Sequence, residues 1–431
     1  MSKKALQVAA VRGTRDLWPS ELSKQLHVTK ALASVASRYG FGPVQTPTIE
    51  STDLFHRSLG DGSDIVMKEM YTFQDNSQNS LTLRPEGTAG VIRSLISSGL
   101  QYNGPHKVFY QGSMFRYERP QRGRYREFQQ FGVEHIGSAG PSTDVDVISL
   151  ARDCLQEIDL LDRVSLEINT LGCHESRLRY RKVLEEFLEK YRADLSIDSQ
   201  QRLDRGSVLR VLDSKCDNDQ RILESAPRLQ QHLSDAARQR FDDVQGGLAA
   251  LGIASNLNDG LVRGLDYYSH TVFEFVELKP ETGAKGIAVL AGGCYDDLVA
   301  LLGGPATPCV GWAAGIERLC LLSTQQPPSP TMIAVVPIAA GDSATVTAVR
   351  HHALRVAKAL RDKGHTVHVC DGSSMKKQMK MADTFQCSFA VLLGEDELHN
   401  DTATVKHLHE RQQHVVPLPE LAAYFKPSAL P

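Results

Sequence analysis

The chain of 431 residues lacks the features that mark several protein classes. Its eight cysteines include no CxxC pair and no Cys/His cluster at metal-binding spacing, which argues against a zinc site. No run of eighteen apolar residues occurs, and the first thirty residues have no apolar core, so we expect neither a membrane span nor a signal peptide. The scattered thiols favour a reducing compartment, and we expect a cytoplasmic protein.

The chain also lacks a strong net charge, which is −3 at pH 7. A nucleic-acid partner would therefore be bound by local basic patches and not by a global field. Hydrophobic residues make up 41% and charged residues 23%, as in ordinary globular proteins, and the length predicts two to three domains.

Basic charge is concentrated within residues 109–135, FYQGSMFRYERPQRGRYREFQQFGVEH. The flanks are strand-like and Pro120 and Gly123 lie between them, which predicts a loop that joins two antiparallel strands. Guanidinium groups bind phosphate and carboxylate through two parallel hydrogen bonds, so the loop suits a polyphosphate. A basic surface loop that only touches nucleic acid is the alternative. The loop holds Arg116, Arg119, Arg122, Arg124 and Arg126, with Glu118 as the only acid.

The strand after this loop is rich in polar residues. It carries Glu127, Gln129, Gln130 and Glu134. Gln130 and Glu134 are four residues apart, so they share one face of the strand. A strand face lined with glutamine and glutamate beside an arginine loop predicts a polar ligand pocket.

Two further junctions place charged residues beside helices. RPEGT, residues 84–88, joins a predicted hairpin to a helix, where Glu86 and Thr88 suit the capping of its N-terminus. CVGWAAGIERLCLL, residues 309–322, leads a strand into an apolar helix that holds Arg318. A buried arginine is costly without an anion, which is either a phosphate or a neighbouring acid such as Glu317.

The remaining chain divides by its patterns. Before the arginine loop, a helix that ends near Arg38 is followed by Pro43 and Pro47, which forbid a helix there. After the loop we expect a helix over 143–161 and a charged, helix-rich block over 172–252. The apolar face of the first helix is predicted to consist of Leu22, Leu26, Leu32, Val35 and Ala36.

The last third begins with strands and ends with an alternating pattern. LVRGLDYYSHTVFEFVEL is a strand region, and KGIAVLAGGCYDDLVALLGG predicts a strand, a glycine turn and a helix. STQQPPSP, residues 323–330, is a linker. Beyond it, strands alternate with helices, which predicts a small, largely parallel sheet covered on both faces. A nucleotide-binding module is the alternative for this region, although no glycine-rich phosphate loop of Rossmann or Walker type occurs.

The segment FRYERPQRGRYREFQQFGVE resembles motif 2 of class II aminoacyl-tRNA synthetases, in the form found in histidyl-tRNA synthetases. LVRGLDYY resembles a signature of the same family, CVGWAAGIERL resembles motif 3, and the helix–strand unit with Pro47 resembles motif 1. The resemblance implies an α+β catalytic domain built on an antiparallel sheet, with a helical insertion, and a C-terminal α/β anticodon-binding domain. The implied boundaries are 1–322 for the catalytic core, about 172–252 for the insertion, 323–330 for the linker and 331–431 for the last domain.

The resemblance also implies a reaction and its partners. Such an enzyme ligates L-histidine to tRNA(His) with ATP through a histidyl-adenylate, and releases AMP and pyrophosphate. Mg²⁺ would arrive with ATP, and motif 1 would build a homodimer interface.

The same resemblance implies which residues bind ATP, which bind histidine and which contact the tRNA. The phosphates of ATP would be held by Arg116, Arg124, Arg263 and Arg318, with Arg116 also at the histidine carboxylate. Glu134 and Tyr268 would bind the histidine ring, while Glu86, Thr88 and Gln130 would bind its amino group. Tyr267 and Tyr295 would line the histidine pocket, and Gln121 would contact the tRNA acceptor.

Two other classes stay open. One is a histidine-binding regulatory paralogue from histidine biosynthesis, without charging activity; such paralogues generally lack the C-terminal domain. The other is a pure RNA-binding or stress-sensing module.

The sequence also departs from the family pattern. Cys294 and Asp297 stand in AGGCYDDLV where the usual pattern is GGRYDGL, and ADTFQCS is an unusual version of an Ala-Asp-Lys-x-Gly-Ala pattern. Cys294 either points into the core, where free cysteine usually lies, or faces the cleft as a reactive thiol.

Overall fold

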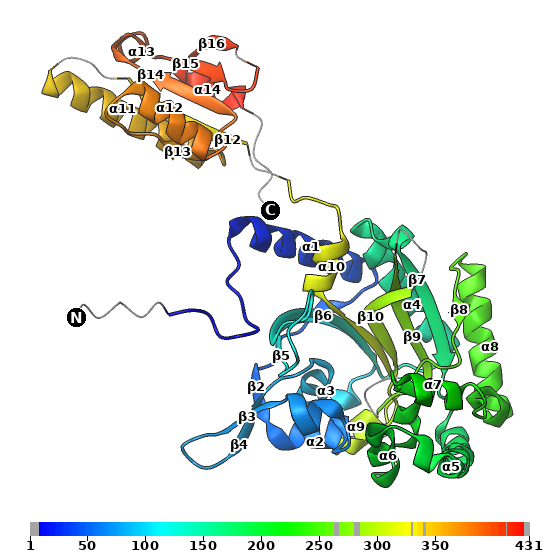
Figure 1. Ribbon diagram of the computed structural model, residues 1–431. Coiled ribbons are helices and arrows are strands. Elements are labelled where there is room, and N and C mark those ends of the chain that lie inside the picture. The colour runs from blue at the N-terminus through cyan, green and yellow to red at the C-terminus, as the bar shows by residue number, and fades with distance from the viewer. Residues whose placement is uncertain are drawn as a thin grey trace, which may run out of the picture. The chain divides into compact units, whose positions relative to one another are not determined.

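The computed structural model describes residues 8–262, 267–279, 285–328, 331–338, 342–410 and 412–425, apart from the side chains of Asp213 and Lys285 (Figure 1). The chain divides into two compact units, Met1–Gln325 and Gln326–Pro431, and each is described by itself. Among the helices in these ranges, none is long and apolar enough to cross a membrane.

The first unit is organised around an eight-stranded sheet with the strand order β1-β5-β6-β11-β10-β9-β7-β8. Neighbouring strands from β5 to β7 run antiparallel, while β1 and β8 pair in parallel at the two edges. The antiparallel sheet expected for the catalytic domain is therefore confirmed. Its strands are β1 (Gly42–Pro43), β5 (His106–Phe115), β6 (Glu127–Ile136), β7 (Val164–Thr170), β8 (Asn256–Leu257), β9 (Ser269–Leu278), β10 (Lys285–Cys294) and β11 (Cys309–Gly315).

Strands β5 and β6 form the predicted hairpin. Phe115 pairs with Glu127 at the loop end of the hairpin, so the arginine loop comprises residues 116–126. Along β6, Val133 enters the apolar core, whereas Gln130 and Glu134 line a cavity on the other face. The two-residue period thus separates a polar face from a core face on one strand.

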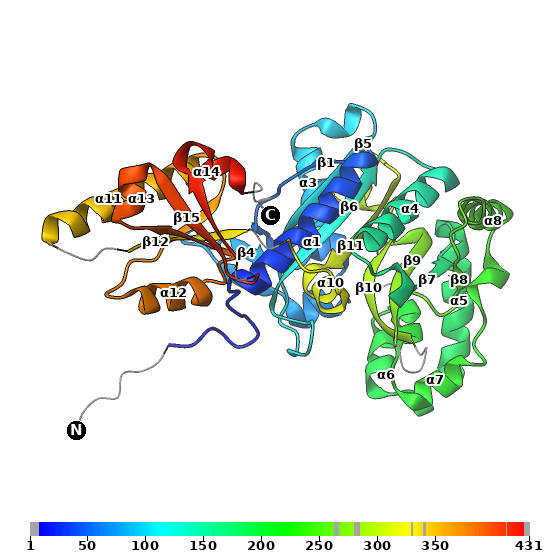
Figure 2. The same ribbon diagram turned by 90° about the horizontal axis from the view of Figure 1, so that it is seen from above.

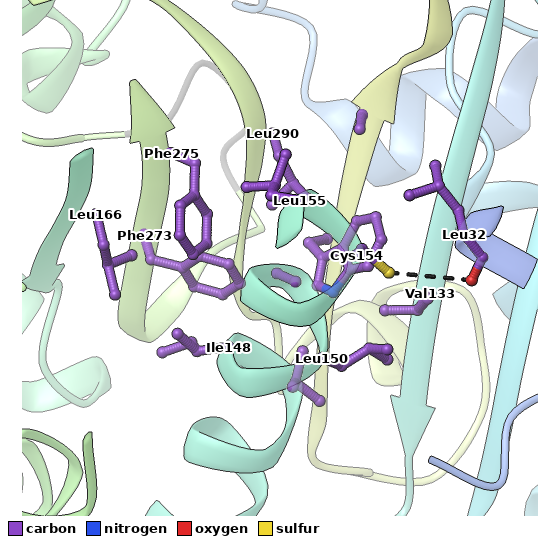
Figure 3. Packing of buried hydrophobic residues seen from close by; sticks show 14 of the residues in the cluster. Leu32, Val133, Ile148, Leu150, Cys154, Leu155, Leu166, Phe273, Phe275 and Leu290 are labelled. Atoms are coloured by element: carbon purple, nitrogen blue, oxygen red, sulfur yellow. Dashed lines mark hydrogen bonds between the residues drawn. The ribbon is translucent and has the colours of Figure 1, made fainter. Parts of the chain in front are cut away.

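Four helices pack on the core face of the sheet (Figure 2). Figure 3 shows Ile148 and Leu155 of the central helix close to Phe273 and Phe275, and the thiol of Cys154 donating to the Leu32 carbonyl oxygen at 3.9 Å. The helix expected over 143–161 begins earlier, because proline suits the first helical position. The four helices are α1 (Pro19–Arg38), α4 (Pro141–Glu157), α8 (Asp235–Ala250) and α10 (Ile316–Leu322).

Only part of the predicted apolar face of α1 reaches this core. Leu32, Val35 and Ala36 are buried, as predicted. Leu22 and Leu26 remain 41% and 56% exposed, so the prediction is wrong for the first half of the helix. Helical spacing identifies an apolar stripe but not what covers it.

The other face of the sheet carries a small sheet, short helices and the first part of the helix-rich block. This block, predicted for residues 172–252, is helical as expected, and its last helix, α8, packs on the core face. The small sheet has the order β2-β4-β3, with β2 (Ile49–Ser51), β3 (Tyr71–Gln74) and β4 (Ser80–Leu83). The helices are α2 (Thr52–Leu59), α3 (Thr88–Ser97), α5 (His174–Lys190), α6 (Ile197–Asp204), α7 (Asp217–Leu223) and α9 (Leu298–Leu301).

The glycine turn predicted in AGGCYDD is wrong, because β10 continues through both glycines to Cys294. A Cβ atom on Gly292 would lie 2.2 Å from the carbonyl oxygen of Gly311, and one on Gly293 would lie 2.6 Å from that of Thr271. Glycine is needed here for the close approach of neighbouring strands and not for a turn.

The second unit contains a five-stranded sheet with the order β13-β12-β14-β15-β16, covered on both faces by apolar clusters. β12, β13 and β14 are parallel, but β15 and β16 are antiparallel, so the predicted parallel sheet is only partly right. The last strand and last helix were not predicted. The elements are β12 (Met332–Pro337), α11 (Ser343–Asp362), β13 (Thr366–Val369), α12 (Met375–Thr384), β14 (Phe389–Leu393), α13 (Glu395–Asn400), β15 (Thr402–His407), β16 (Gln413–Pro417) and α14 (Leu418–Tyr424).

Candidate active site

A cavity of about 320 Å³ opens on the polar face of the large sheet. Strands β6, β10 and β11, the arginine loop, the start of α3 and the start of α10 all contribute to its walls. It brings together ten of the predicted site residues: Glu86, Thr88, Arg116, Arg124, Gln130, Glu134, Tyr267, Tyr268, Tyr295 and Arg318.

Two other predicted residues stand apart. Gln121 is exposed in the arginine loop, where its backbone exchanges hydrogen bonds with Arg124 at 3.2 and 2.8 Å. Arg263 lies outside the described residues.

One end of the cavity is acidic and closed. Glu134 is 1% exposed, and its Oε1 accepts a hydrogen bond from the Thr88 hydroxyl at 2.6 Å, while Oε2 accepts one from the Tyr295 hydroxyl. Gly311 of β11 pairs with Glu134 of β6. A Cβ atom on residue 311 would lie 1.9 Å from Oε2 of Glu134, so only glycine leaves room for the carboxylate. Burial raises the pKa of Glu134 to about 8, although these two hydrogen bonds oppose the shift.

Glu86 is a second buried acid at this end, and it is 4% exposed. Its carboxylate accepts the backbone N–H groups of Thr88 at 2.7 Å and Ala89 at 2.8 Å, so it caps α3 as predicted. Burial raises the pKa of Glu86, and the two backbone hydrogen bonds partly offset that rise. Gln130 completes the polar lining and accepts the Tyr110 hydroxyl at 3.3 Å.

Three tyrosine rings pack against one another along the acidic end, in tilted and edge-to-face contacts. The rings of Tyr267 and Tyr268 are 4.7 Å apart, and those of Tyr267 and Tyr295 are 5.6 Å apart. Burial raises the pKa of Tyr267 and of Tyr295, so both hydroxyls stay neutral and can donate.

The opposite end is cationic. Arg116 donates from Nε to the Pro85 carbonyl oxygen at 2.8 Å, and Arg318 donates from Nη1 to that of Ala288 at 2.7 Å. Arg124 lies 3.3 Å from Glu118, and Arg116 lies 3.9 Å from the same acid. Burial, and then the nearby Arg124, lowers the pKa of Arg318. Such a cluster favours an anion with several oxygens.

Glu317 does not serve as the partner of Arg318. Its carboxylate accepts the backbone N–H of Gln129 at 3.0 and 3.1 Å and the side-chain amide of Gln25 at 3.5 Å. The alternative of an Arg318–Glu317 ion pair is therefore wrong. Glu317 instead links α10 to β6 and α1.

Cys294 is 1% exposed and lies in the core behind the pocket, so the core interpretation of this residue is confirmed. Three acids on the cavity wall, Glu118, Glu274 and Glu317, were not predicted as site residues. Glu274 is the first acid in TVFEFVEL and interrupts its apolar residues, and that interruption is the signal that could have identified it. In the part of the chain that the structure describes, no three His, Cys, Asp or Glu side chains form a metal-binding group.

Comparison with known proteins gives the following relatives. A family model described as histidyl-tRNA synthetase matches residues 13–319, and one described as anticodon binding domain matches residues 332–427. A histidine–tRNA ligase of Rhodospirillum rubrum is 46% identical over 96% of this chain and 97% of its own length.

Two solved structures are also similar. The apo histidyl-tRNA synthetase of S. aureus is 33% identical with a TM-score of 0.79, covering 97% of this chain and 100% of that one. A protein from Bacillus halodurans, described as an ATP phosphoribosyltransferase regulatory subunit/histidyl-tRNA synthetase, has a TM-score of 0.64 over 88% of this chain and 97% of that one. At 20% identity, this second likeness shows the fold alone.

Proposed function

Because the chain belongs to the histidyl-tRNA synthetase family, we propose that it ligates L-histidine to tRNA(His) in an ATP-dependent reaction. Histidine and ATP form histidyl-adenylate and pyrophosphate, and the 3′ end of the tRNA then takes the histidyl group and releases AMP. The observation that carries this proposal is the single cavity that joins a buried acidic end to an arginine cluster.

The acidic end suits the histidine substrate. Glu134 and Tyr268 bind the two ring nitrogens, and Glu86, Thr88 and Gln130 bind the ammonium group, since all five lie on one cavity. A buried pocket that hydrogen-bonds a ring N–H rejects analogues without that group far better than an apolar pocket does. Tyr267 and Tyr295 enclose the ring.

The arginine end suits ATP. Attack of the histidine carboxylate on the α-phosphate needs no general base, because the carboxylate is already ionised. Negative charge gathers on the phosphate oxygens, so fixed cations are the main requirement. Arg116 binds the α-phosphate and the histidine carboxylate, Arg318 the γ-phosphate, and Arg124 supports them. By resemblance, Arg263 binds the α-phosphate from the other side, and Mg²⁺ arrives with ATP.

Residues outside the cavity bind the tRNA and a second copy of the chain in this proposal. The second unit reads the anticodon, supported by its family match, and Gln121 contacts the acceptor. A homodimer forms along the first half of α1, supported by the exposed Trp18, Leu22 and Leu26, because contiguous apolar surface marks interaction sites. A cytoplasmic location is supported by the eight cysteines, all of which are free.

The decisive test is the exchange of pyrophosphate into ATP. We expect exchange with histidine and with no other standard amino acid. Equal exchange with glutamine would contradict the specificity assigned to Glu134 and Tyr268. No exchange with any amino acid would favour the regulatory paralogue, against which the full-length match to histidine–tRNA ligases argues.

A chain that ends at Pro328 tests the role of the second unit. It should keep measurable exchange, because the cavity lies entirely within the first unit. It should need a higher tRNA concentration for charging. Unchanged tRNA affinity would show that the second unit does not read the anticodon.

A further inference from the structure

Two arginines of the helical block 174–250 reach the back of the proposed histidine pocket. Arg177 of α5 donates from Nη1 to the Tyr268 carbonyl oxygen at 2.7 Å and from Nη2 to Asp297 Oδ2 at 2.8 Å. Arg240 of α8 donates from Nη2 to both oxygens of Asp144 at 3.2 Å, and to the sulfur of Cys294 at 3.5 Å. Both arginines are mostly buried, with side chains 17% and 19% exposed.

Asp144 is the centre of the second contact. It lies in the first turn of α4 and is 1% exposed. It also accepts the Thr271 hydroxyl of β9 at 2.7 Å and the Cys294 thiol of β10 at 3.3 Å. A carboxylate at this depth needs a cation as well as hydrogen bonds, and α8 supplies it through Arg240.

These two arginines contact the two positions at which the chain departs from GGRYDGL. Cys294 stands where that pattern has arginine, and Asp297 stands where it has glycine. Arg240 of α8 places a guanidinium group beside Cys294. Asp297 adds a carboxylate, and Arg177 binds it.

The contacted residues adjoin the pocket tyrosines. Tyr295 directly follows Cys294, and its hydroxyl donates to Glu134. The ring of Tyr268 packs over β10, where a Cβ on Gly293 would lie 3.1 Å from its Cδ1. A displacement of residues 294–297, or of the Tyr268 carbonyl group, therefore moves two phenol rings of the pocket.

We propose that Arg177 and Arg240 are positioning residues, which hold the histidine pocket in shape and make the helical block a structural part of it. The inference rests on the proposed function in one respect, namely that histidine occupies this cavity. The arginines touch neither substrate, and they act through Tyr268 and Tyr295.

The test is a loss and a rescue of histidine affinity, measured by titration calorimetry on the full chain. Arg240→Met should weaken histidine binding about tenfold or more, because a displaced pocket group leaves a hydrogen bond to histidine unmade, which costs about 1–3 kcal/mol, or about 5- to 150-fold in affinity. ATP affinity should not change, since the cavity arginines proposed to bind ATP lie on the arginine loop and on α10. Arg177→Met should act in the same direction. Arg238→Met is the matched control, because this exposed arginine of α8 donates its one side-chain hydrogen bond among the described residues to the Gln230 carbonyl oxygen within the same block.

The double variant Arg240→Met, Cys294→Arg places an arginine in the same cluster, on β10 instead of on α8. It should restore histidine affinity, and it should do so even if Arg240→Met alone fails to fold. Unchanged affinity in Arg240→Met, an equal loss of ATP affinity, or a double variant that does not regain histidine binding would each overturn the proposal. Pyrophosphate exchange by the unmodified protein is measured separately, so a failed exchange assay refutes the ligase function while histidine binding still tests the arginines.

Discussion

The two ends of the cavity are built on opposite principles. At the acidic end, each oxygen of Glu134 already accepts a hydrogen bond, and Glu86 is held by two backbone N–H groups. At the arginine end, Arg116 and Arg318 each donate one nitrogen to a carbonyl oxygen, and Arg116 and Arg124 share Glu118. The acidic end is thus organised by hydrogen bonds within the protein, while the arginine end gathers three guanidinium groups on one wall of the cavity.

This difference matches the two tasks of the proposed reaction. Recognition of a small amino acid requires a rigid pocket whose groups are already oriented. Phosphoryl chemistry requires fixed positive charge where negative charge develops, and a guanidinium held by one nitrogen keeps its others for phosphate. Substitutions at the two ends should therefore separate histidine binding from catalysis.

The largest effect should follow from Arg318→Met at the arginine end. We expect the rate of pyrophosphate exchange to fall about 10² to 10³-fold, as when one donor to transition-state charge is removed. Histidine affinity should stay unchanged. Arg122→Met, an exposed arginine of the same loop, is the control and should keep full exchange. An equal loss of histidine affinity in Arg318→Met would show that the two ends do not act separately.

Glu134→Gln should give the next largest effect, confined to histidine. The amide keeps the shape but replaces one carboxyl oxygen with an NH₂ group, so one buried partner loses its hydrogen bond. An unsatisfied buried polar group costs about 1–3 kcal/mol, or about 5- to 150-fold in affinity. Calorimetric titration with histidine measures this loss, and the KM for ATP should not change. A matching rise in the KM for ATP would break the division between the two ends.

The raised pKa of Glu134, about 8 instead of 4.5, gives a smaller effect on stability. Between these values the folded protein holds a proton that the unfolded chain has released, so stability falls as pH rises through this window. Glu134→Gln removes this penalty. The Tm of the variant minus that of the unmodified protein, both without histidine, should therefore increase from pH 5 to pH 8. A constant difference would mean that Glu134 is ionised throughout and that its pKa is not raised.

The smallest effect concerns whether a reagent can reach the acidic end of the cavity from the core side of the sheet, where Cys294 lies. Cys294 is buried against Asp144, and burial raises the pKa of its thiol, so iodoacetamide should not label it with or without substrates. Cys173 is the comparison. Burial alone would raise its pKa, but hydrogen bonds with Ser176 and Ser234 outweigh burial and lower the pKa to about 7. Peptide mapping should therefore find Cys173 labelled first, and early labelling of Cys294 would show that the pocket is open from behind.

The sequence alone determined the parts of this molecule that local pattern controls. Alternation in VFYQGSMF and REFQQFGVEH predicts the β5–β6 hairpin, because side chains of a strand face opposite sides in turn. The residues Glu86 and Thr88 after Pro85 predict a helix start, because free N–H groups there need acceptors. Ten of the predicted site residues meet in one cavity, but most of them were identified through the family resemblance of the segments that hold them and not through local pattern.

Local pattern failed where the reason for a residue lies on another strand. Gly292 and Gly293 look like a turn in sequence, but their neighbours are Gly311 and Thr271 on adjacent strands. The same holds for Leu22 and Leu26, whose helical spacing indicates burial although the described residues of the first unit leave them 41% and 56% exposed. Direction in the last sheet also escaped prediction, because β15 and β16 have no pattern that tells antiparallel from parallel pairing.

Tertiary structure alone decided which charges balance one another. Arg318 has Glu317 as its neighbour in sequence, yet Glu317 turns to Gln129 and Gln25, and Arg318 faces the cavity. Arg240 lies 96 residues from Asp144, and Cys294 lies 150 residues from it, so no local spacing relates them. A charge or a thiol has no periodic signature, and its role follows from the atoms that folding brings within a few ångströms.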